Sequence, residues 1–264
     1  MSVPNVPSAV LPDLRVWYQS FTHPEETGEY HRRLTAFLAE VARPGCRVDV
    51  KGMIPPTRKH RITELRCAVE VVRNAIRAEQ EGYDVFVVGH FQDAGLWDAR
   101  SAVKIPVIGL GESAMLHACT LGRKIGLITI DPLFIPIHEE QIERYGLQHR
   151  VVMTVAVQSG TSDYERAFAD AEFAKTVREK YAKQIQPLVE RGIEVIIPAG
   201  GLPLMLLADG GPLETGGAVI LNGLAVAVKA AETAADLRRL VGMEPSRAST
   251  FIMPHEAALK TLMS

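Results

Sequence analysis

Short apolar runs alternate along the chain with longer stretches whose apolar positions follow the helical period. The runs are rich in Val and Ile, as are strands covered on both faces of a parallel sheet. We expect strands at residues 14–19, 47–53, 85–90, 107–109, 125–130, 151–157, 195–198 and 219–221. We expect helices at residues 28–42, 62–81, 113–121, 136–145, 167–191 and 224–241. This alternation predicts an α/β protein built from strand–helix–strand units.

The two halves of the chain carry a similar series of elements. In each half an amphipathic helix ends near a glycine (Gly82 or Gly192), a Val/Ile strand follows, and the strand ends in a glycine-containing turn. Two Rossmann-like lobes, each a short parallel sheet flanked by helices, would produce this pattern. We expect the first lobe at residues 14–118 plus 222–264 and the second at residues 119–221. Ligands bind beyond the carboxyl ends of such strands, so we expect an active site in the cleft between the lobes.

Composition narrows the class of protein. With 264 residues, 47% hydrophobic and 23% charged, the chain resembles an ordinary globular protein. A net charge of −2 provides no basic footprint for nucleic acid. No apolar run reaches the length of about 18 residues that a membrane span needs, and residues 1–13 lack the pattern of a signal peptide. The odd count of three cysteines argues against a disulfide framework. We therefore expect a cytoplasmic protein without nucleic-acid or membrane partners.

Two of the predicted strands end in turns that could carry chemistry. His90 ends one strand, and an imidazole with an ordinary pKa of about 6.5 can serve as an acid or a base. The alternative is that His90 only hydrogen-bonds a nearby backbone group. Asp93, three residues later, could orient His90 or cap the following helix. Ala199 ends the other strand, and Gly200 and Gly201 follow it. They could offer backbone N–H groups to a carboxylate or enolate oxygen, or simply form a tight turn.

Together, residues 83–96 and 193–204 resemble the paired active-site segments of the aspartate/glutamate/hydantoin racemase superfamily. The family pattern is roughly Cys-Phe-x-Asp-x-Gly-Leu in the first segment and Gly-Cys-x-x-Leu-Pro or Gly-Cys-Ala-Gly-Met in the second. His90 and Ala199 stand where the family has its two cysteines. Segments 106–115, 124–129, 143–147 and 222–229 are similar to the family in the same order, so the resemblance covers roughly residues 14–232.

The resemblance implies a cofactor-independent enzyme that acts on a small anionic carboxylate or amide compound through an enolate-like intermediate. Racemases of this family move a proton with one thiol on each face of the substrate carbon. Ala199 cannot transfer a proton, so the chain is not expected to be a two-base racemase unless another residue serves the second face. An isomerase, a decarboxylase or other carbon–carbon lyase, a hydrolase that uses His90, and a degenerate metabolite-binding protein all remain open.

The resemblance also implies further site residues. The catalytic set comprises His90, Asp93 and Asp131, although Asp131 departs from the family pattern and could equally cap the helix opened by Pro132. The substrate-binding set comprises Tyr18, Gln19, Ser20, Phe91, Gln92, Thr129, Ala199, Gly200 and Gly201. No metal or cofactor is expected, because His138-Glu139 has no third ligand at a recognisable spacing.

Three remaining segments are assigned simpler roles. Residues 51–61 form a locally basic stretch that could attract an anionic substrate, form a lid, or be a solvated face. His117 and Cys119 lie in an apolar helix and are expected in the core. The tail around residues 251–253 could pack against a neighbouring subunit, since relatives often form homo-oligomers.

Overall fold

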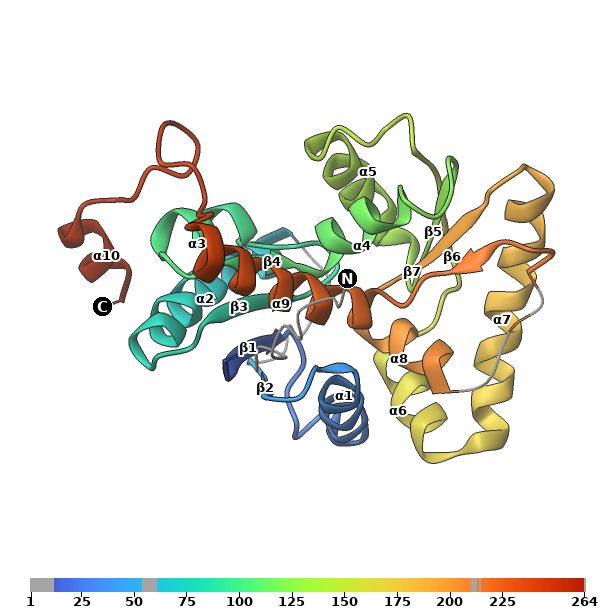
Figure 1. Ribbon diagram of the computed structural model, residues 1–264. Helices are drawn as coiled ribbons and strands as arrows, with labels where there is room; N and C mark the ends of the chain where they lie inside the picture. Colours follow the sequence, from blue (N-terminus) through green and yellow to red (C-terminus); the bar gives the residue numbers. More distant parts are fainter. Residues whose placement is uncertain (1–11, 54–60, 210–212, 214, 264) are drawn as a thin grey trace, which may run out of the picture.

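The computed structural model describes residues 12–53, 61–209, 213 and 215–263. Two four-stranded parallel sheets form its framework (Figure 1). The first has the order β2-β1-β3-β4, and its strands are β1 (Leu14–Ser20), β2 (Cys46–Lys51), β3 (Val85–Gly89) and β4 (Val107–Gly109). The second has the order β6-β5-β7-β8, with β5 (Ile125–Thr129), β6 (Val151–Ala156), β7 (Val195–Ala199) and β8 (Val219–Ile220). The α/β fold with two similar parallel sheets is confirmed.

Helices flank both sheets. In chain order they are α1 (Gly28–Val41), α2 (Arg61–Gln80), α3 (Leu96–Ala102), α4 (Leu110–Ala118), α5 (Ile135–Arg144), α6 (Thr161–Ala169), α7 (Ala171–Glu190), α8 (Gly201–Asp209), α9 (Gly223–Val241) and α10 (Glu256–Met263). A short 3-10 helix, η1 (Pro132–Phe134), precedes α5. After β8 the chain returns to the first sheet through α9, which contacts β3, β4 and α4. Sheet membership thus supports the predicted division into lobes, which stays a prediction.

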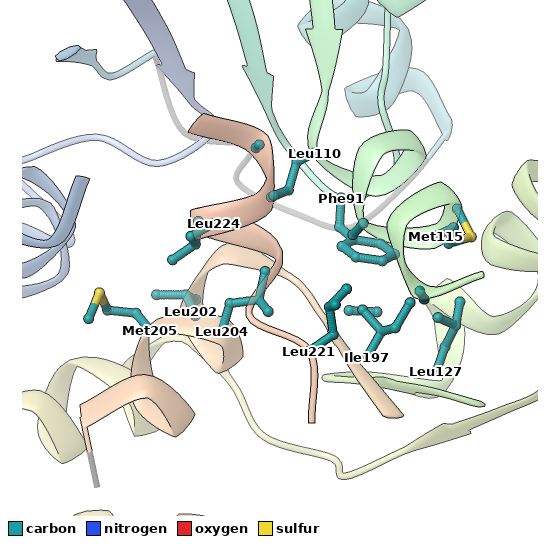
Figure 2. Close-up of a cluster of buried hydrophobic side chains, with 14 of the residues drawn as sticks. Phe91, Leu110, Met115, Leu127, Ile197, Leu202, Leu204, Met205, Leu221 and Leu224 are labelled. Atoms are coloured by element: carbon teal, nitrogen blue, oxygen red, sulfur yellow. The ribbon is translucent and has the colours of Figure 1, made fainter. Parts of the chain in front are cut away.

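A hydrophobic cluster joins the two sheets. Figure 2 shows Phe91 and Met115 from the first half of the chain beside Leu127 of β5 and Ile197 of β7. Leu224 of α9 belongs to the same cluster and is fully buried. Because apolar burial contributes about 25 cal/mol per Å², this shared core holds the strand ends of both sheets in fixed positions.

The helix predictions were wrong in two places. The expected helix at residues 167–191 is two helices, because Asp170 adopts an extended conformation and its side chain accepts the N–H groups of Glu172 and Phe173 as the N-cap of α7. The expected helix at residues 113–121 occupies Leu110–Ala118 instead. His117 is exposed and Cys119, which follows that helix, is half-buried, so neither is a core residue.

The tail after α9 packs on its own chain. The Arg247 guanidinium donates to the carbonyl oxygens of Arg100 and Val103, and the ring of Phe251 lies 6.3 Å from that of Trp97. Helix α10 contributes Leu259 to a smaller apolar cluster formed with α2 and α3. The expected contact of this tail with a second subunit stays a prediction. No helix in the described part of the chain is long and apolar enough to cross a membrane.

Candidate functional site

A small cavity lies where the two sheets point their strand ends at each other. Its volume is about 150 Å³. The third strands of the two sheets, β3 and β7, occupy equivalent places in the two strand orders, and the residues that follow them line the same cavity. Six of the predicted site residues line it: Ser20, His90, Gln92, Ala199, Gly200 and Gly201. The two turns singled out from the sequence are therefore brought together.

His90 is held on one wall of the cavity. Its ring stacks on Phe21 with the centroids 4.1 Å apart and the planes only 6° from parallel. Its Nδ1 atom lies 3.7 Å from the Glu64 carboxylate of α2 and hydrogen-bonds no described residue. Burial lowers the pKa of His90 below its ordinary value of 6.5, and the Glu64 charge opposes that shift. At neutral pH the imidazole is uncharged, which leaves a lone pair available to accept a proton.

The turn after β7 forms another part of the wall. Gly200 has a φ of 154°, a value that side-chain-bearing residues avoid, so the glycine is required there. Helix α8 starts at Gly201, and the N–H groups of Gly201 and Leu202 donate to no other described residue. The turn is therefore tight, as one interpretation expects, and the helix start leaves donors unused; binding of a substrate oxygen by these donors stays a prediction. Such an end favours a negatively charged oxygen.

Asp93 does not line the cavity, and it does not cap the helix that follows it. Its carboxylate instead accepts the N–H groups of Gly111 and Glu112 at the start of α4, the Gln141 amide at 3.0 Å and the Tyr145 hydroxyl at 2.7 Å. Asp93 therefore caps a helix, but that helix is α4, which begins seventeen residues later in the chain. Burial raises the pKa of Asp93 to about 7, while its hydrogen bonds with Tyr145, Gly111 and Glu112 lower it.

The other predicted acid, Asp131, caps a helix. Its side chain accepts the Leu133 N–H at 3.0 Å, as the simpler interpretation expects, and it is not part of the cavity wall. Thr129 is fully buried behind the wall, where its hydroxyl lies 3.2 Å from Nε2 of His138. The other ring nitrogen of His138 pairs with Gln141 at 3.2 Å. No group of three potential metal-ligating side chains occurs among the described residues.

Three more predicted substrate contacts lie in the protein interior. Tyr18 is fully buried in the core between the sheets, and Phe91 belongs to the same cluster (Figure 2). The Gln19 amide is occupied by protein groups, because it accepts from Trp17 and Asn74 and donates to the Lys51 carbonyl. Position along the strand explains the difference within β1: Ser20 is the last residue of the strand and lines the cavity, whereas Tyr18 and Gln19 lie further inside it.

Sequence reasoning missed several wall residues. They are Phe21, Thr22, Tyr30, Glu64, Cys67, Gly89, Ile130, Phe134, Thr161, Leu202 and Pro203. Phe21 and Thr22 come soon after a predicted strand and Ile130 ends another, so the strand-end rule could have found them. Glu64 and Cys67 are three apart on α2, a spacing that puts them on one helix face, yet nothing local marks that face as part of a site. Burial raises the pKa of the Cys67 thiol to about 11, so this thiol stays protonated near neutral pH.

The basic stretch at residues 51–61 lies largely outside the described residues, which include only 51–53 and 61 of it. The Lys51 ammonium lies 5.4 Å from the centre of the Trp17 ring. Arg61 forms an ion pair with Glu140 of α5. Both described cations of this segment therefore have protein partners.

Comparison with known proteins shows the family of the chain. Residues 23–231 match the Asp/Glu/Hydantoin racemase family. The chain is 30% identical over 186 residues to a hydantoin racemase of Pseudomonas sp. (strain NS671), a match that covers 70% of each protein. It is also 30% identical over 178 residues to a hydantoin racemase of Rhizobium meliloti, covering 67% of this chain and 69% of that protein.

Solved structures share the fold. The allantoin racemase from Klebsiella pneumoniae has a TM-score of 0.78 at 20% identity, covering 92% of this chain and 95% of the other. The glutamate racemase from Thermus thermophilus has a TM-score of 0.59 at 17% identity, covering 96% of this chain and 92% of the other. The fold is thus the two-lobed fold of these racemase structures. The chain belongs to the Asp/Glu/hydantoin racemase superfamily.

Proposed function

We propose that this protein is a cofactor-independent acid/base enzyme that acts on a small amide or carboxylate compound through an enolate-like intermediate. Hydantoin-type cyclic amides are the first substrates to try, since the relatives with the highest sequence identity reported above are named hydantoin racemases. The observation that carries the proposal is that His90 and the Ala199–Gly201 turn line one cavity from equivalent strands of the two sheets.

His90 is the acid/base in this proposal. The Glu64 carboxylate near Nδ1 favours the tautomer that carries its proton on Nδ1, which leaves the Nε2 lone pair for the substrate. Nε2 takes the proton from the acidic carbon, the C–H electron pair forms a C=C bond to the neighbouring carbonyl carbon, and the carbonyl π electron pair moves onto the oxygen. The N–H groups at the start of α8 stabilise the charge that develops on that oxygen. The proton then returns from His90 to the same face of the carbon.

A single base makes the reaction one-sided. Ala199 supplies no proton carrier on its side of the cavity, and the protonated Cys67 thiol comes from α2, the same helix that carries Glu64. Isomerisation through a rearranged enolate and one-sided decarboxylation both fit this arrangement, whereas two-base racemisation does not. Neither turn carries a thiol, which favours decarboxylation or another carbon–carbon cleavage as the second candidate reaction.

Deuterium exchange tests the proposal. The purified protein is incubated in deuterated water with monosubstituted hydantoins and small carboxylic acids, and loss of the proton from the acidic carbon is followed by NMR. We expect exchange above the rate without protein, and a loss of at least 100-fold in His90→Ala, as is typical for a general base. Binding without exchange or turnover would instead identify a degenerate metabolite-binding protein. Exchange that survives in His90→Ala but fails in Cys67→Ser would assign the base to the thiol.

A further inference from the structure

Tyr30 of α1 lines the cavity beside the β7 turn. Only 2% of the residue is exposed, and its hydroxyl donates to no described residue. A side chain at Gly201 would overlap this hydroxyl, whereas the next ring atom, Cζ, would be 3.3 Å from the added Cβ. The missing side chain at Gly201 is therefore what allows the Tyr30 hydroxyl to reach the start of α8.

Tyr30 is held in place by contacts with helix α6. It stacks on Phe168 of α6 at a centroid distance of 6.0 Å. Its backbone N–H donates to the Glu165 carboxylate, also of α6, at 3.1 Å. Burial raises the pKa of the Tyr30 hydroxyl, and the Glu165 charge raises it further. The hydroxyl thus stays protonated and acts as a hydrogen-bond donor, not as a base.

We propose that the Tyr30 hydroxyl joins the N–H groups of Gly201 and Leu202 to form a three-donor cradle for the substrate oxygen. Three donors that converge from a side chain and a helix start suit the carbonyl oxygen of an imide or amide, whose negative charge grows as the neighbouring carbon loses its proton. No proton is transferred by Tyr30: the C–H electron pair forms the C=C bond of the enolate, the carbonyl π pair moves onto the oxygen, and the proton moves to His90. This inference rests on the proposed function and adds Tyr30 as a catalytic residue.

Removing one hydroxyl tests the cradle. Tyr30→Phe should lower the exchange rate about 100-fold with a much smaller change in KM, because a donor to a developing oxyanion acts mainly in the transition state. Tyr83→Phe is the matched control, since Tyr83 is also a buried residue, but its hydroxyl donates to Asp49 and neither residue lines the cavity. It should keep the wild-type rate. A Tyr30→Phe rate within twofold of wild type overturns the cradle.

A stability cycle tests the placement of the hydroxyl without relying on activity. Gly201→Ala alone should lower the melting temperature, because the new methyl group collides with the hydroxyl. In the Tyr30→Phe background, Gly201→Ala should lower the melting temperature by clearly less. Equal losses in both backgrounds would show that the hydroxyl does not lie against Gly201 and would overturn the inference.

The two proposals fail in distinguishable ways. Suppose that the wild type exchanges protons, that His90→Ala abolishes this exchange and that Tyr30→Phe leaves its rate unchanged. Only the cradle is then wrong. If the wild type exchanges protons in none of the compounds, the proposed function is wrong. The cradle is then tested by measuring the binding of hydantoin by calorimetry. Binding weakened about tenfold by Tyr30→Phe but not by Tyr83→Phe supports a carbonyl-binding cradle. Unchanged or absent binding overturns it.

Discussion

At the scale of single residues, the pair formed by His90 and Glu64 controls the proposed chemistry. Burial lowers the pKa of His90 and the Glu64 charge raises it, so Glu64→Gln should let that pKa fall further. The acid limb of the kcat/KM profile, expected below pH 6.5, should move to lower pH, and the rate should drop about tenfold because a less basic imidazole is a weaker base. Glu70→Gln on the same helix is the control. An unmoved limb in Glu64→Gln would show that Glu64 does not act on His90.

His138 makes stability depend on pH. It is fully buried, and desolvation lowers its pKa from 6.5 to about 4. The folded state therefore favours the neutral ring, and this contribution is complete above pH 6.5 and is lost as the pH falls towards about 4. The shift corresponds to roughly 3 kcal/mol. The free energy of unfolding, measured with urea, should fall as the pH is lowered from 7 to 4.5. This fall should be about 2 kcal/mol smaller in His138→Gln than in the wild type. Equal losses in the two proteins would contradict the shift.

At the scale of elements, Asp93 connects the turn after β3 to two helices. Asp93→Ala leaves the start of α4 uncapped and removes the acceptor of Tyr145 and Gln141. The free energy of unfolding should fall by about 3 kcal/mol, the size expected when a buried hydrogen-bond network is broken. Asp98→Ala, on exposed surface of α3, should change it by less than about 0.5 kcal/mol. A loss below 1 kcal/mol for Asp93→Ala would contradict this role.

Most elements were predictable from sequence, because their signals are local. Val/Ile runs gave all eight strands to within two residues, and the long amphipathic helices followed from their period. The short helices α3, α8 and α10 have no counterpart among the expected helix ranges, and α6 was merged with α7: α3 spans only seven residues, and α8 is almost wholly apolar. The roles of Asp93 and Gln19 could not be read locally, since their partners are distant in sequence and become neighbours only in the fold. The strand-end rule found His90 and Gly201, but not Tyr30 or Glu64, which reach the cavity from helices.

At the scale of the whole molecule, the contact of α6 with α1 joins the two halves beside the cavity. Glu165 accepts the N–H groups of Glu29 at 3.3 Å and of Tyr30 at 3.1 Å. Glu165→Ala should lower the free energy of unfolding by about 1 kcal/mol, as loss of a helix cap does. It should also slow exchange several-fold, because Tyr30 loses its support from α6. Glu172→Ala on exposed surface of α7 should do neither. If proton exchange slows equally in Glu165→Ala and Glu172→Ala, support of Tyr30 by Glu165 does not explain the slowing.

In the proposed reaction, one imidazole moves the proton on one face of the substrate. The most direct measurement follows a single enantiomer of a monosubstituted hydantoin in deuterated water, with NMR reporting deuterium uptake and chiral chromatography reporting configuration, against a sample without protein. We predict that deuterium enters the acidic carbon with retained configuration and that His90→Ala abolishes this uptake. Inversion as fast as deuterium uptake, or uptake unchanged in His90→Ala, would contradict the account.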